Sequence, residues 1–278
     1  MADHTQRSRA VGGGRTYAGQ LPPHDRAAAR QFGAGAGLPP VEQAGNPTMD
    51  MRTLYELYLH ALEKEPSIGE AVRADITAYY ERDPACDQYC LPLLYFKGYH
   101  AIQAHRINHC LWKEGRKTLA YFLQNRASEV FGVDIHPVAR FGQGIMIDHG
   151  TGVVIGETAV LGNDISILHG VTLGETAVLG NDISILHGVT LGGSGKEGGD
   201  RHPKIGDGVM IGANASVLGN IRVNECAKIG AGSVVVAEVP AYSTVGVPAR
   251  VVGNKSHAKP AEEMNQNFYE EMNQDFYI

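Results

Sequence analysis

Two short stretches of this 278-residue chain combine side chains that can perform acid–base and ion-pair chemistry. Residues 148–152 read DHGTG and place the imidazole of His149 directly after a carboxylate, and the glycine-rich stretch GGSGKEGGDRHPK at 192–204 carries Arg201 and His202. An imidazole titrates near neutrality and can take a proton from a hydroxyl. The planar fork of an arginine suits a carboxylate. On the residues alone, a solvated turn and a solubilising loop are the alternative interpretations.

Histidines and cysteines elsewhere in the chain form weaker patterns. His100, His105 and His109 fall on one predicted helix, the last two at i, i+4 spacing, but no HExxH zinc motif accompanies them. Cys86 and Cys90 are too isolated to make a metal site, and four cysteines are too few for a disulfide scaffold. We therefore expect no metal, and a reducing, cytoplasmic setting.

The overall composition argues against two classes of partner. The formal net charge is −6, whereas a nucleic-acid-binding surface is basic, although a local basic patch for a phosphate-bearing ligand stays compatible with it. No apolar run approaches the ~18 residues that span a membrane, and the first residues lack the apolar segment of a signal peptide. We expect a globular protein that binds neither nucleic acid nor a membrane.

The first half of the chain divides into two segments. Residues 1–48 contain GGG and GAGAG without apolar periodicity, which predicts a disordered extension. A transit peptide or a mis-assigned start are alternatives, since Met49 and Met51 immediately precede the first helical pattern. Residues 49–130 carry leucine and isoleucine at helical spacing and predict a small helical domain, punctuated at Pro84.

A different period begins near residue 135, where apolar residues recur every six positions and glycine often follows them. This period is typical of a parallel β-helix, in which each hexad forms a short strand and a turn and three hexads close a coil of about 18 residues. The register slips by two between Val153 and Ile155, and the loop 192–204 stands outside it. The apolar positions are Ile135, Phe141, Ile147, Val153, Ile155, Leu161, Ile167, Leu173, Leu179, Ile185, Leu191, Ile205, Ile211, Val217, Val223, Ile229 and Val235.

One unit of this pattern occurs twice in direct succession. Residues 156–173 read GETAVLGNDISILHGVTL, and residues 174–191 repeat them letter for letter. Because 18 residues make one coil, regular stacking of the copy would lengthen the prism by ~4.8 Å. In the alternative, one copy bulges out and exposes isoleucine and leucine side chains, which is costly. We expect the copied histidines, His169 and His187, to be exposed turn residues.

Several motifs together resemble one known family, the bacterial serine O-acetyltransferases. FGVDIHPVARFGQGIMIDHGTGVVIGETAV spans 131–160, GGSGKEGGDRHPKIGDGVMIGA spans 192–213, VGVPARVVG spans 245–253 and RDPACDQY spans 82–89. The resemblance covers roughly residues 60–255. DIHP, DHGTG and GGDRHPKI in combination distinguish this family from other hexapeptide acyltransferases.

The resemblance implies an α+β fold, in which the helical domain precedes a left-handed parallel β-helix over residues 131–253. It also implies a homotrimer or a dimer of trimers. The implied reaction transfers acetyl from the co-substrate acetyl-CoA to the hydroxyl of L-serine, which gives O-acetylserine for cysteine biosynthesis.

The resemblance also assigns roles to single residues. It implies that His149 is the general base and that Asp134, fifteen residues earlier, orients its ring. Asp148 and Asp83 match positions that hold substrate serine, although Asp83 precedes a proline and can equally well cap a helix. Arg201 and His202 match loop residues that face the substrate carboxylate from the neighbouring subunit.

Acetyl-CoA is expected in a groove between two prisms, where small residues let the pantetheine approach and backbone amides face the thioester oxygen. The residues that match family groove positions are Gly193, Ser194, Ala213 and Ala231, and Lys228 is available for the phosphate charge. Each of them is also compatible with an ordinary coil corner.

The last residues, 254–278, are expected to form a flexible tail. In the family a tail that ends in isoleucine docks into the next enzyme, O-acetylserine sulfhydrylase, and Ile278 is the matching anchor. The duplicated coil lies between His149 and the groove positions. The alternative function is therefore a catalytically impaired trimeric scaffold that still binds the sulfhydrylase.

Overall fold

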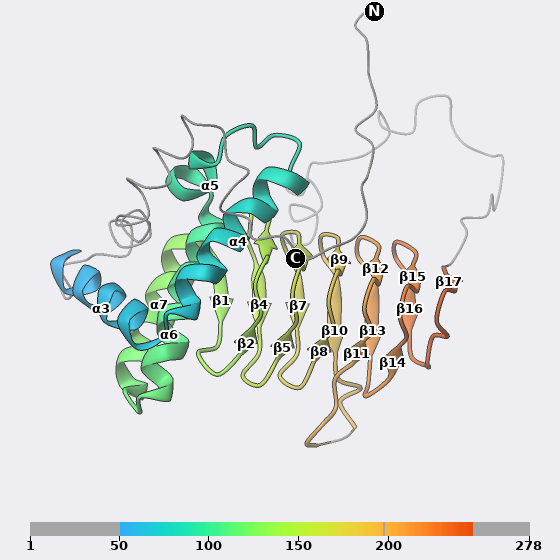
Figure 1. The fold of residues 1–278 in the computed structure, drawn as a ribbon. Coiled ribbons are helices and arrows are strands. Elements are labelled where there is room, and N and C mark those ends of the chain that lie inside the picture. The colour runs from blue at the N-terminus through green and yellow to red at the C-terminus, as the bar shows by residue number, and fades with distance from the viewer. Residues whose placement is uncertain (1–50, 197, 247–278) are drawn as a thin grey trace, which may run out of the picture. The chain divides into compact units, whose positions relative to one another are not determined.

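The structure is a computed structural model, and it describes residues 51–196 and 198–246, which belong to one compact unit (Figure 1). Helices occupy the first part of this range and short strands the remainder, as the change of period predicts. None of the described helices is long and apolar enough to cross a membrane. The helices are α3 (Met51–Lys64), α4 (Ser67–Arg82), α5 (Cys90–Tyr95), α6 (Lys97–Lys113) and α7 (Lys117–Phe131).

Helix α6 is the centre of the helical region. It packs against α3, α4, α5 and α7 and also against strands β1 and β3, which explains why it is buried on most of its surface. Helix α7 ends at Gly132, whose φ of 67° is the left-handed conformation that glycine adopts without a steric penalty. One residue later the first strand begins.

The strands form three parallel sheets that wind as a prism. The first sheet contains β1 (Val133–Ile135), β4 (Val153–Ile155), β7 (Thr172–Leu173), β10 (Thr190–Gly192), β13 (Ser216–Leu218) and β16 (Val234–Val235). The second contains β2 (Arg140–Phe141), β5 (Val160–Leu161), β8 (Val178–Leu179), β11 (Lys204–Ile205) and β14 (Arg222–Val223). The third contains β3 (Met146–Ile147), β6 (Ser166–Ile167), β9 (Ser184–Ile185), β12 (Met210–Ile211), β15 (Lys228–Ile229) and β17 (Thr244–Val245). The prediction of helices followed by a parallel β-helix is confirmed.

Turns between the sheets form the edges of the prism, and two of these edges matter for function. The loop edge joins the first sheet to the second and contains residues 136–139, 156–159, 174–177 and the long loop 193–203. The histidine edge joins the third sheet to the first and contains residues 148–152, 168–171, 186–189, 212–215 and 230–233. Predicted site residues fall on both edges.

The duplicated unit is accommodated as a regular coil. Leu161 pairs with Leu179, and Leu173 pairs with Leu191, each in parallel register, and all four side chains are buried. The alternative in which one copy bulges out is therefore wrong. Because the core column continues unbroken, the prism is one coil longer than a chain without the copy would make it.

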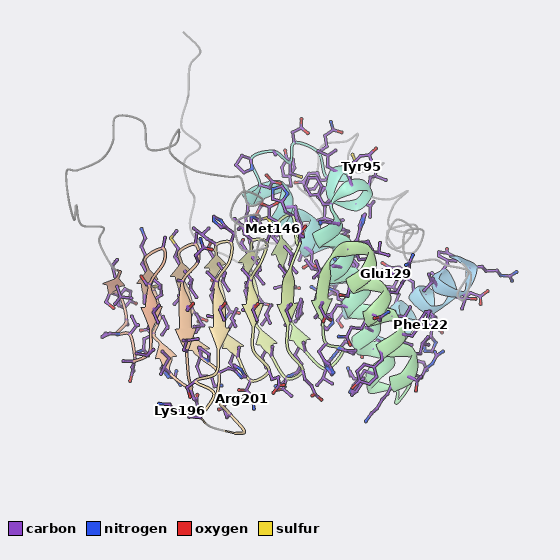
Figure 2. The ribbon with its side chains drawn as sticks, turned by 180° about the vertical axis from the view of Figure 1, so that it is seen from behind. Tyr95, Phe122, Glu129, Met146, Lys196 and Arg201 are labelled. Carbon is purple, nitrogen blue, oxygen red and sulfur yellow. The ribbon has the colours of Figure 1, made fainter. Side chains whose placement is uncertain are left out.

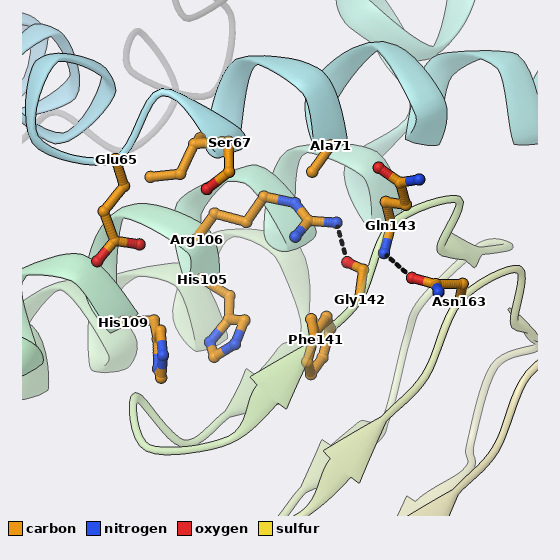
Figure 3. A pocket seen from close by; sticks show the side chains of 11 residues that line it. Glu65, Ser67, Ala71, His105, Arg106, His109, Phe141, Gly142, Gln143 and Asn163 are labelled. Carbon is orange, nitrogen blue, oxygen red and sulfur yellow. Dashed lines mark hydrogen bonds between the residues drawn. The ribbon is translucent and has the colours of Figure 1, made fainter.

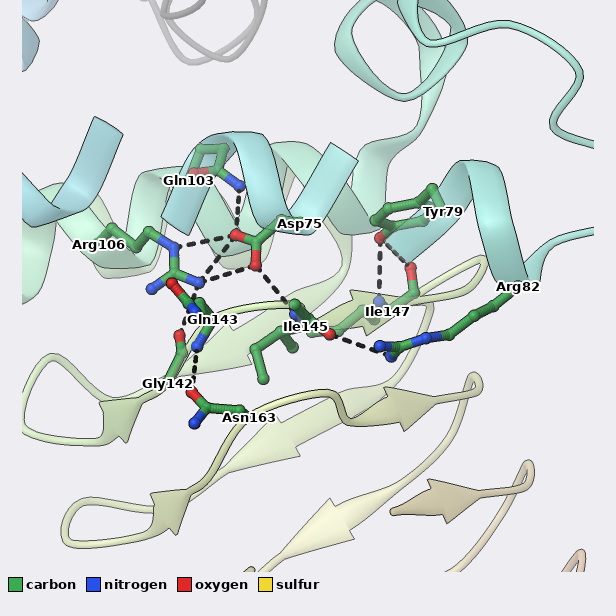
Figure 4. Close-up of polar contacts among 11 residues, drawn as sticks. Asp75, Tyr79, Arg82, Gln103, Arg106, Gly142, Gln143, Ile145, Ile147 and Asn163 are labelled. Carbon is green, nitrogen blue, oxygen red and sulfur yellow. Dashed lines mark hydrogen bonds and ion pairs between the residues drawn. The ribbon is translucent and has the colours of Figure 1, made fainter. Parts of the chain in front are cut away.

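Helix α4 covers the free edge of strand β3, the outermost strand of the third sheet (Figure 4). Asp75 accepts a hydrogen bond from the Ile145 amide at 2.9 Å, and the Tyr79 hydroxyl accepts one from the Ile147 amide at 3.0 Å. One turn further along the same face, Arg82 donates to a carbonyl of the turn before β3. These side chains occupy i, i+4 and i+7, so one stripe of the helix replaces the missing neighbour strand.

The first turn of α6 lies directly against the same strand. A Cβ atom added to Gly98 would lie 1.9 Å from the carbonyl oxygen of Ile147, a contact that any larger residue would have to relieve by moving backbone. The strand held in this way ends at Ile147, and the next two residues are Asp148 and His149.

Candidate functional site

His149 is the central residue of a tight, unusual turn on the histidine edge. Its φ is 56°, and the Gly150 amide donates to the Asp148 carbonyl at 2.6 Å, so the hydrogen bond spans three residues. Turns of this kind are strained, because a side-chain-bearing residue rarely adopts positive φ. His169 and His187, at the matching positions of the next coils, are not among the residues with positive φ. Such strain is often found at functional sites.

This turn is also longer than its counterparts. Ile147 pairs with Ile167, twenty residues on, whereas Val154 pairs with Thr172, eighteen residues on. The two extra residues lie within 148–152 and account for the slip of the hexad register. They enlarge the turn only in the coil that carries His149.

The His149 side chain is open to solvent, and its nearest ionisable partner is the adjacent aspartate. Its Nε2 lies 3.9 Å from Oδ2 of Asp148, and its side chain is 76% exposed. Asp134 lies on β1 and accepts a hydrogen bond from Gln124 at 2.7 Å. Within the described residues the two predicted partners, His149 and Asp134, share no hydrogen bond, so the orienting role of Asp134 stays a prediction.

Asp83, from the helical region, contributes charge to the neighbourhood of this turn. It follows the last residue of α4, and its carboxylate accepts from the Ala85 amide at 2.8 Å in an Asx turn. No helix begins there, so Asp83 does not cap the start of a helix. Burial raises the pKa of Tyr79 well above its ordinary value, and the nearby carboxylates of Asp75, Asp148 and Asp83 raise it further. The carboxylates of Asp148 and Asp83, both predicted to hold serine, therefore lie near enough to Tyr79 to raise its pKa.

Arg201 and His202 lie on the loop edge, against the second copy of the duplicated unit. Arg201 forms an ion pair with Glu175 at 2.9 Å. His202 is buried and stacks over Gly174, where an added Cβ would lie 2.0 Å from the ring. Burial, with the positive charge of Arg201, lowers the pKa of His202, so its ring stays neutral near neutral pH. Gly193 is close by, since a Cβ there would lie 3.2 Å from the Arg201 side chain.

The structure thus sorts the predicted residues into two groups. Asp148 and His149 share the histidine edge with Ala213 and Ala231, and Lys228 lies on β15 just before Ala231. The loop-edge group is Gly193, Ser194, Arg201 and His202. Figure 2 shows the separation, with Met146 of β3 near one border of the prism and Arg201 near the other. One chain alone does not bring the two groups together.

Along the histidine edge, successive coils place His149, His169, His187, Ala213 and Ala231 in one column. The rings of the first two are 6.2 Å apart, and those of the second and third stack at 5.2 Å. As expected of turn residues, His169 is exposed, whereas His187 is half-buried. At ~4.8 Å per coil, three steps put Ala213 about 14 Å from the level of His149, against about 10 Å without the copy.

A cavity lies elsewhere, in the seam between the helices and β2 (Figure 3). Its lining includes His105, Arg106, His109 and Phe141, and none of the predicted site residues. His105 and His109 each bond a backbone carbonyl of the loop edge, at 3.1 and 2.8 Å, and so fasten α6 to the prism. In the described ranges no group of three or more metal-ligating side chains is present.

Sequence reasoning missed three contributors to this geometry. Tyr79 holds the strand before His149, Lys97 hydrogen-bonds the hydroxyl of Thr151 within the site turn, and Thr176 bonds the Arg201–His202 segment. The sequence signal that could have identified Tyr79 is its i+4 spacing from Asp75, which puts the two polar groups on one face of a helix with only a weak apolar stripe. Nothing in the local sequence marks Thr176, because its surroundings are identical to those of Thr158.

Comparison with known proteins shows to which family the chain belongs. Residues 41–104 match the family model "Serine acetyltransferase, N-terminal", and residues 202–237 match the bacterial transferase hexapeptide model. The chain is 52% identical over 224 residues to the serine acetyltransferase of Haemophilus influenzae, across 80% of this chain and 77% of the relative.

Solved structures of serine acetyltransferases share the fold. The Neisseria gonorrhoeae protein in complex with serine is 59% identical, covers 83% of this chain and 90% of its own, and superposes with a TM-score of 0.64. The Brucella abortus protein in complex with coenzyme A is 43% identical, covers 84% and 91% respectively, and also scores 0.64. With half of its aligned residues shared with a named relative over four fifths of its length, the chain belongs to the serine acetyltransferase family.

Proposed function

We propose that this chain is a serine O-acetyltransferase, which transfers acetyl from acetyl-CoA to the hydroxyl of L-serine with His149 as general base. The observation that carries the proposal is the strained turn that presents an exposed imidazole beside the carboxylate of Asp148, in a chain of this family. Related structures contain serine in one case and coenzyme A in another.

The chemistry follows from the groups at the turn. The His149 imidazole takes the hydroxyl proton of serine while the oxygen attacks the thioester carbonyl carbon. A tetrahedral oxyanion forms and collapses, the carbon–sulfur bond breaks, and the imidazolium returns its proton to the leaving thiolate. Asp134 is proposed to orient the ring, and Asp148 and Asp83 to hold the amine and hydroxyl ends of serine.

The separation of the two edges supports a site shared between subunits. Arg201 and His202 cannot serve the His149 of their own chain without crossing the prism, whereas a neighbouring prism can present its loop edge to this histidine edge. In a closed ring of three copies, the loop edge of each copy meets the histidine edge of the next, so no edge of either kind is left without a partner. We therefore propose a homotrimer, or a dimer of trimers, in which the loop of one subunit completes the site of the next.

Acetyl-CoA is proposed to lie in the groove between two prisms, where the histidine edge of one subunit faces the loop edge of its neighbour. Ala213 and Ala231 occupy neighbouring coils with small side chains, as a closely approaching pantetheine requires, and Lys228 is exposed on the adjacent strand. Gly193 and Ser194 border the groove from the loop edge. No metal takes part in this scheme.

The extra coil favours a second candidate, an impaired trimeric scaffold. The copy adds one coil between His149 and the groove alanines, and active sites tolerate shifts of only about an ångström. Such a scaffold would bind O-acetylserine sulfhydrylase through Ile278, which lies outside the described residues. The cytoplasmic setting also stays a prediction, with which the four free cysteines agree.

Thiol release from acetyl-CoA in the presence of L-serine tests the proposal. We expect release by the full chain and its loss in His149→Ala. The matched control is His169→Ala, which removes an exposed imidazole one coil away and should retain release. Equal activity of both variants would refute His149 as the base, and absence of release from the full chain would favour the scaffold.

A further inference from the structure

We infer that Thr176, and not the identical Thr158, is the positioning residue for Arg201 and His202, so that the second copy of the duplicated unit has taken over the support of the substrate-facing loop. The inference rests on the proposed function for its catalytic consequence. Its structural part rests on contacts alone.

Thr176 makes hydrogen bonds to both loop residues. Its hydroxyl oxygen accepts from the Arg201 amide at 3.0 Å and from the His202 amide at 3.2 Å. Its own amide donates to Nδ1 of His202 at 3.1 Å. One residue thus holds two successive backbone amides and one ring nitrogen of the loop.

Thr158 occupies the same place in the first copy and has different neighbours. Its hydroxyl donates to the Glu175 carbonyl at 2.7 Å, which belongs to the next coil and not to the loop. The two threonines sit in identical 18-residue units, so the difference comes only from the segment that succeeds each unit along the prism axis.

The contacts to Thr176 decide which nitrogen of His202 carries the proton. An amide can only donate, so Nδ1 must be unprotonated, and the neutral ring carries its proton on Nε2. Burial lowers the pKa of this ring, which agrees with the neutral form. The backbone amide of Thr176 therefore sets the His202 tautomer that carries an N–H donor on Nε2, and an N–H donor is the group that a substrate carboxylate requires.

Glu175 completes the support. It binds Arg201 through one Nη2 contact at 2.9 Å, and a guanidinium has further N–H donors with which to meet a carboxylate. Arg201 and His202 are thus held from the same coil, in a geometry that leaves donors on both side chains.

The test compares Thr176→Val with Thr158→Val in the full chain, with Thr176→Ser as the conservative rescue. Hydrogen–deuterium exchange reports the Arg201 and His202 amides without any need for activity. We expect exchange of these amides to rise about tenfold or more in Thr176→Val, to stay unchanged in Thr158→Val, and to recover in Thr176→Ser. Equal exchange in the two valine variants would overturn the inference.

Kinetics then test the catalytic consequence. Thr176→Val should raise KM for L-serine by about tenfold and leave KM for acetyl-CoA nearly unchanged, because only the carboxylate donors move. A fall of both affinities together in Thr176→Val would indicate general damage and would overturn the positioning role. If the full chain releases no thiol, the proposed function fails while the exchange experiment still decides the contact.

Discussion

The hydroxyl of Tyr79 lies 2.7 Å from the carbonyl oxygen of Ile147 and 3.0 Å from its amide nitrogen, so one buried side chain serves both polar groups of one residue. Strand β3 has no neighbour strand on this side within the described range, and those groups would otherwise be buried without partners. Since Asp148 and His149 follow directly, Tyr79 links the helical region to the strained turn.

Replacing Tyr79 with phenylalanine should therefore affect both stability and turnover. Loss of the hydroxyl leaves two buried backbone groups without a partner, which costs about 1–3 kcal/mol of unfolding free energy. We also expect kcat for thiol release to fall about tenfold, because Ile147 is no longer held by the helix and the turn that carries His149 becomes less well positioned. The measurements are urea unfolding at fixed protein concentration and steady-state kinetics.

Tyr99→Phe is the matched control for that change. Tyr99 is equally buried, lies 6.0 Å from Tyr79 by ring centroids, and its hydroxyl has no hydrogen-bond partner among the described residues. Its removal should be neutral or stabilising. If the two phenylalanine variants behave alike, the link from Tyr79 to the turn is not what sets activity.

A second prediction concerns the buried ion pair between Asp75 and Arg106. The Asp75 carboxylate is fully buried and accepts a hydrogen bond from the Arg106 guanidinium at 2.8 Å (Figure 4). It also accepts a hydrogen bond from the Ile145 amide. Asp75→Ala leaves a buried positive charge unpaired and should cost about 3–5 kcal/mol of unfolding free energy.

An exposed pair supplies the comparison for this prediction. Glu56 contacts Arg52 at 3.1 Å with both side chains largely in solvent, so Glu56→Gln should cost no more than about 0.5 kcal/mol. Urea unfolding of both variants measures the difference. Similar losses in the two would show that burial does not decide the strength of the Asp75 pair.

A third prediction is a loss of stability in mild acid. Burial lowers the pKa of His105 well below 6.5, and the positive charges of His109 and Arg106 lower it further. Because the folded-state pKa lies below the unfolded value, the neutral ring contributes stability above about pH 6.5, and this is lost as pH falls toward the folded-state pKa. The melting temperature should therefore drop between about pH 7.5 and pH 5.

His105→Gln tests the source of this pH dependence. A glutamine amide can donate to the Ala139 carbonyl, as the ring does at 3.1 Å, but it does not titrate. We expect a smaller drop of the melting temperature in the variant, not its abolition, since burial also lowers the pKa of His100 and His202. An unchanged drop would assign the effect to other groups.

How far the sequence predicts this molecule depends on which interactions are periodic. Ile147, Leu161 and Leu179 lie on strands at the expected hexad positions, because every coil repeats the same burial. The Tyr79 contact was not predictable in the same way, since it joins residues 68 positions apart and belongs to no repeat. Thr176 and Thr158 are a sharper case, because identical local sequence acquires different contacts from the adjoining coil.

The last prediction concerns the extra coil itself. Removing residues 174–191 and removing residues 156–173 give the same 260-residue sequence (278 − 18). In it, one threonine equivalent to Thr158 and Thr176 remains, in the coil that precedes the loop. The loop contacts should persist, while the distance from the level of His149 to Ala213 shortens from about 14 to about 10 Å. We expect the shorter chain to release thiol at least about tenfold faster, because site geometry tolerates only about an ångström of misplacement.

Two controls separate this effect from a change in folding. Each described strand of the prism pairs only with strands of the adjacent coils, so the shorter chain keeps the helix contacts of the first coil and the pairing pattern of every remaining coil. Its melting temperature should therefore differ little from that of the full chain. His149→Ala in the shorter chain should remove the gain, which ties it to the same base. Equal turnover of the long and short chains would mean that the shared site forms across subunits whose prisms slide by one coil, and the spacing argument would then be wrong.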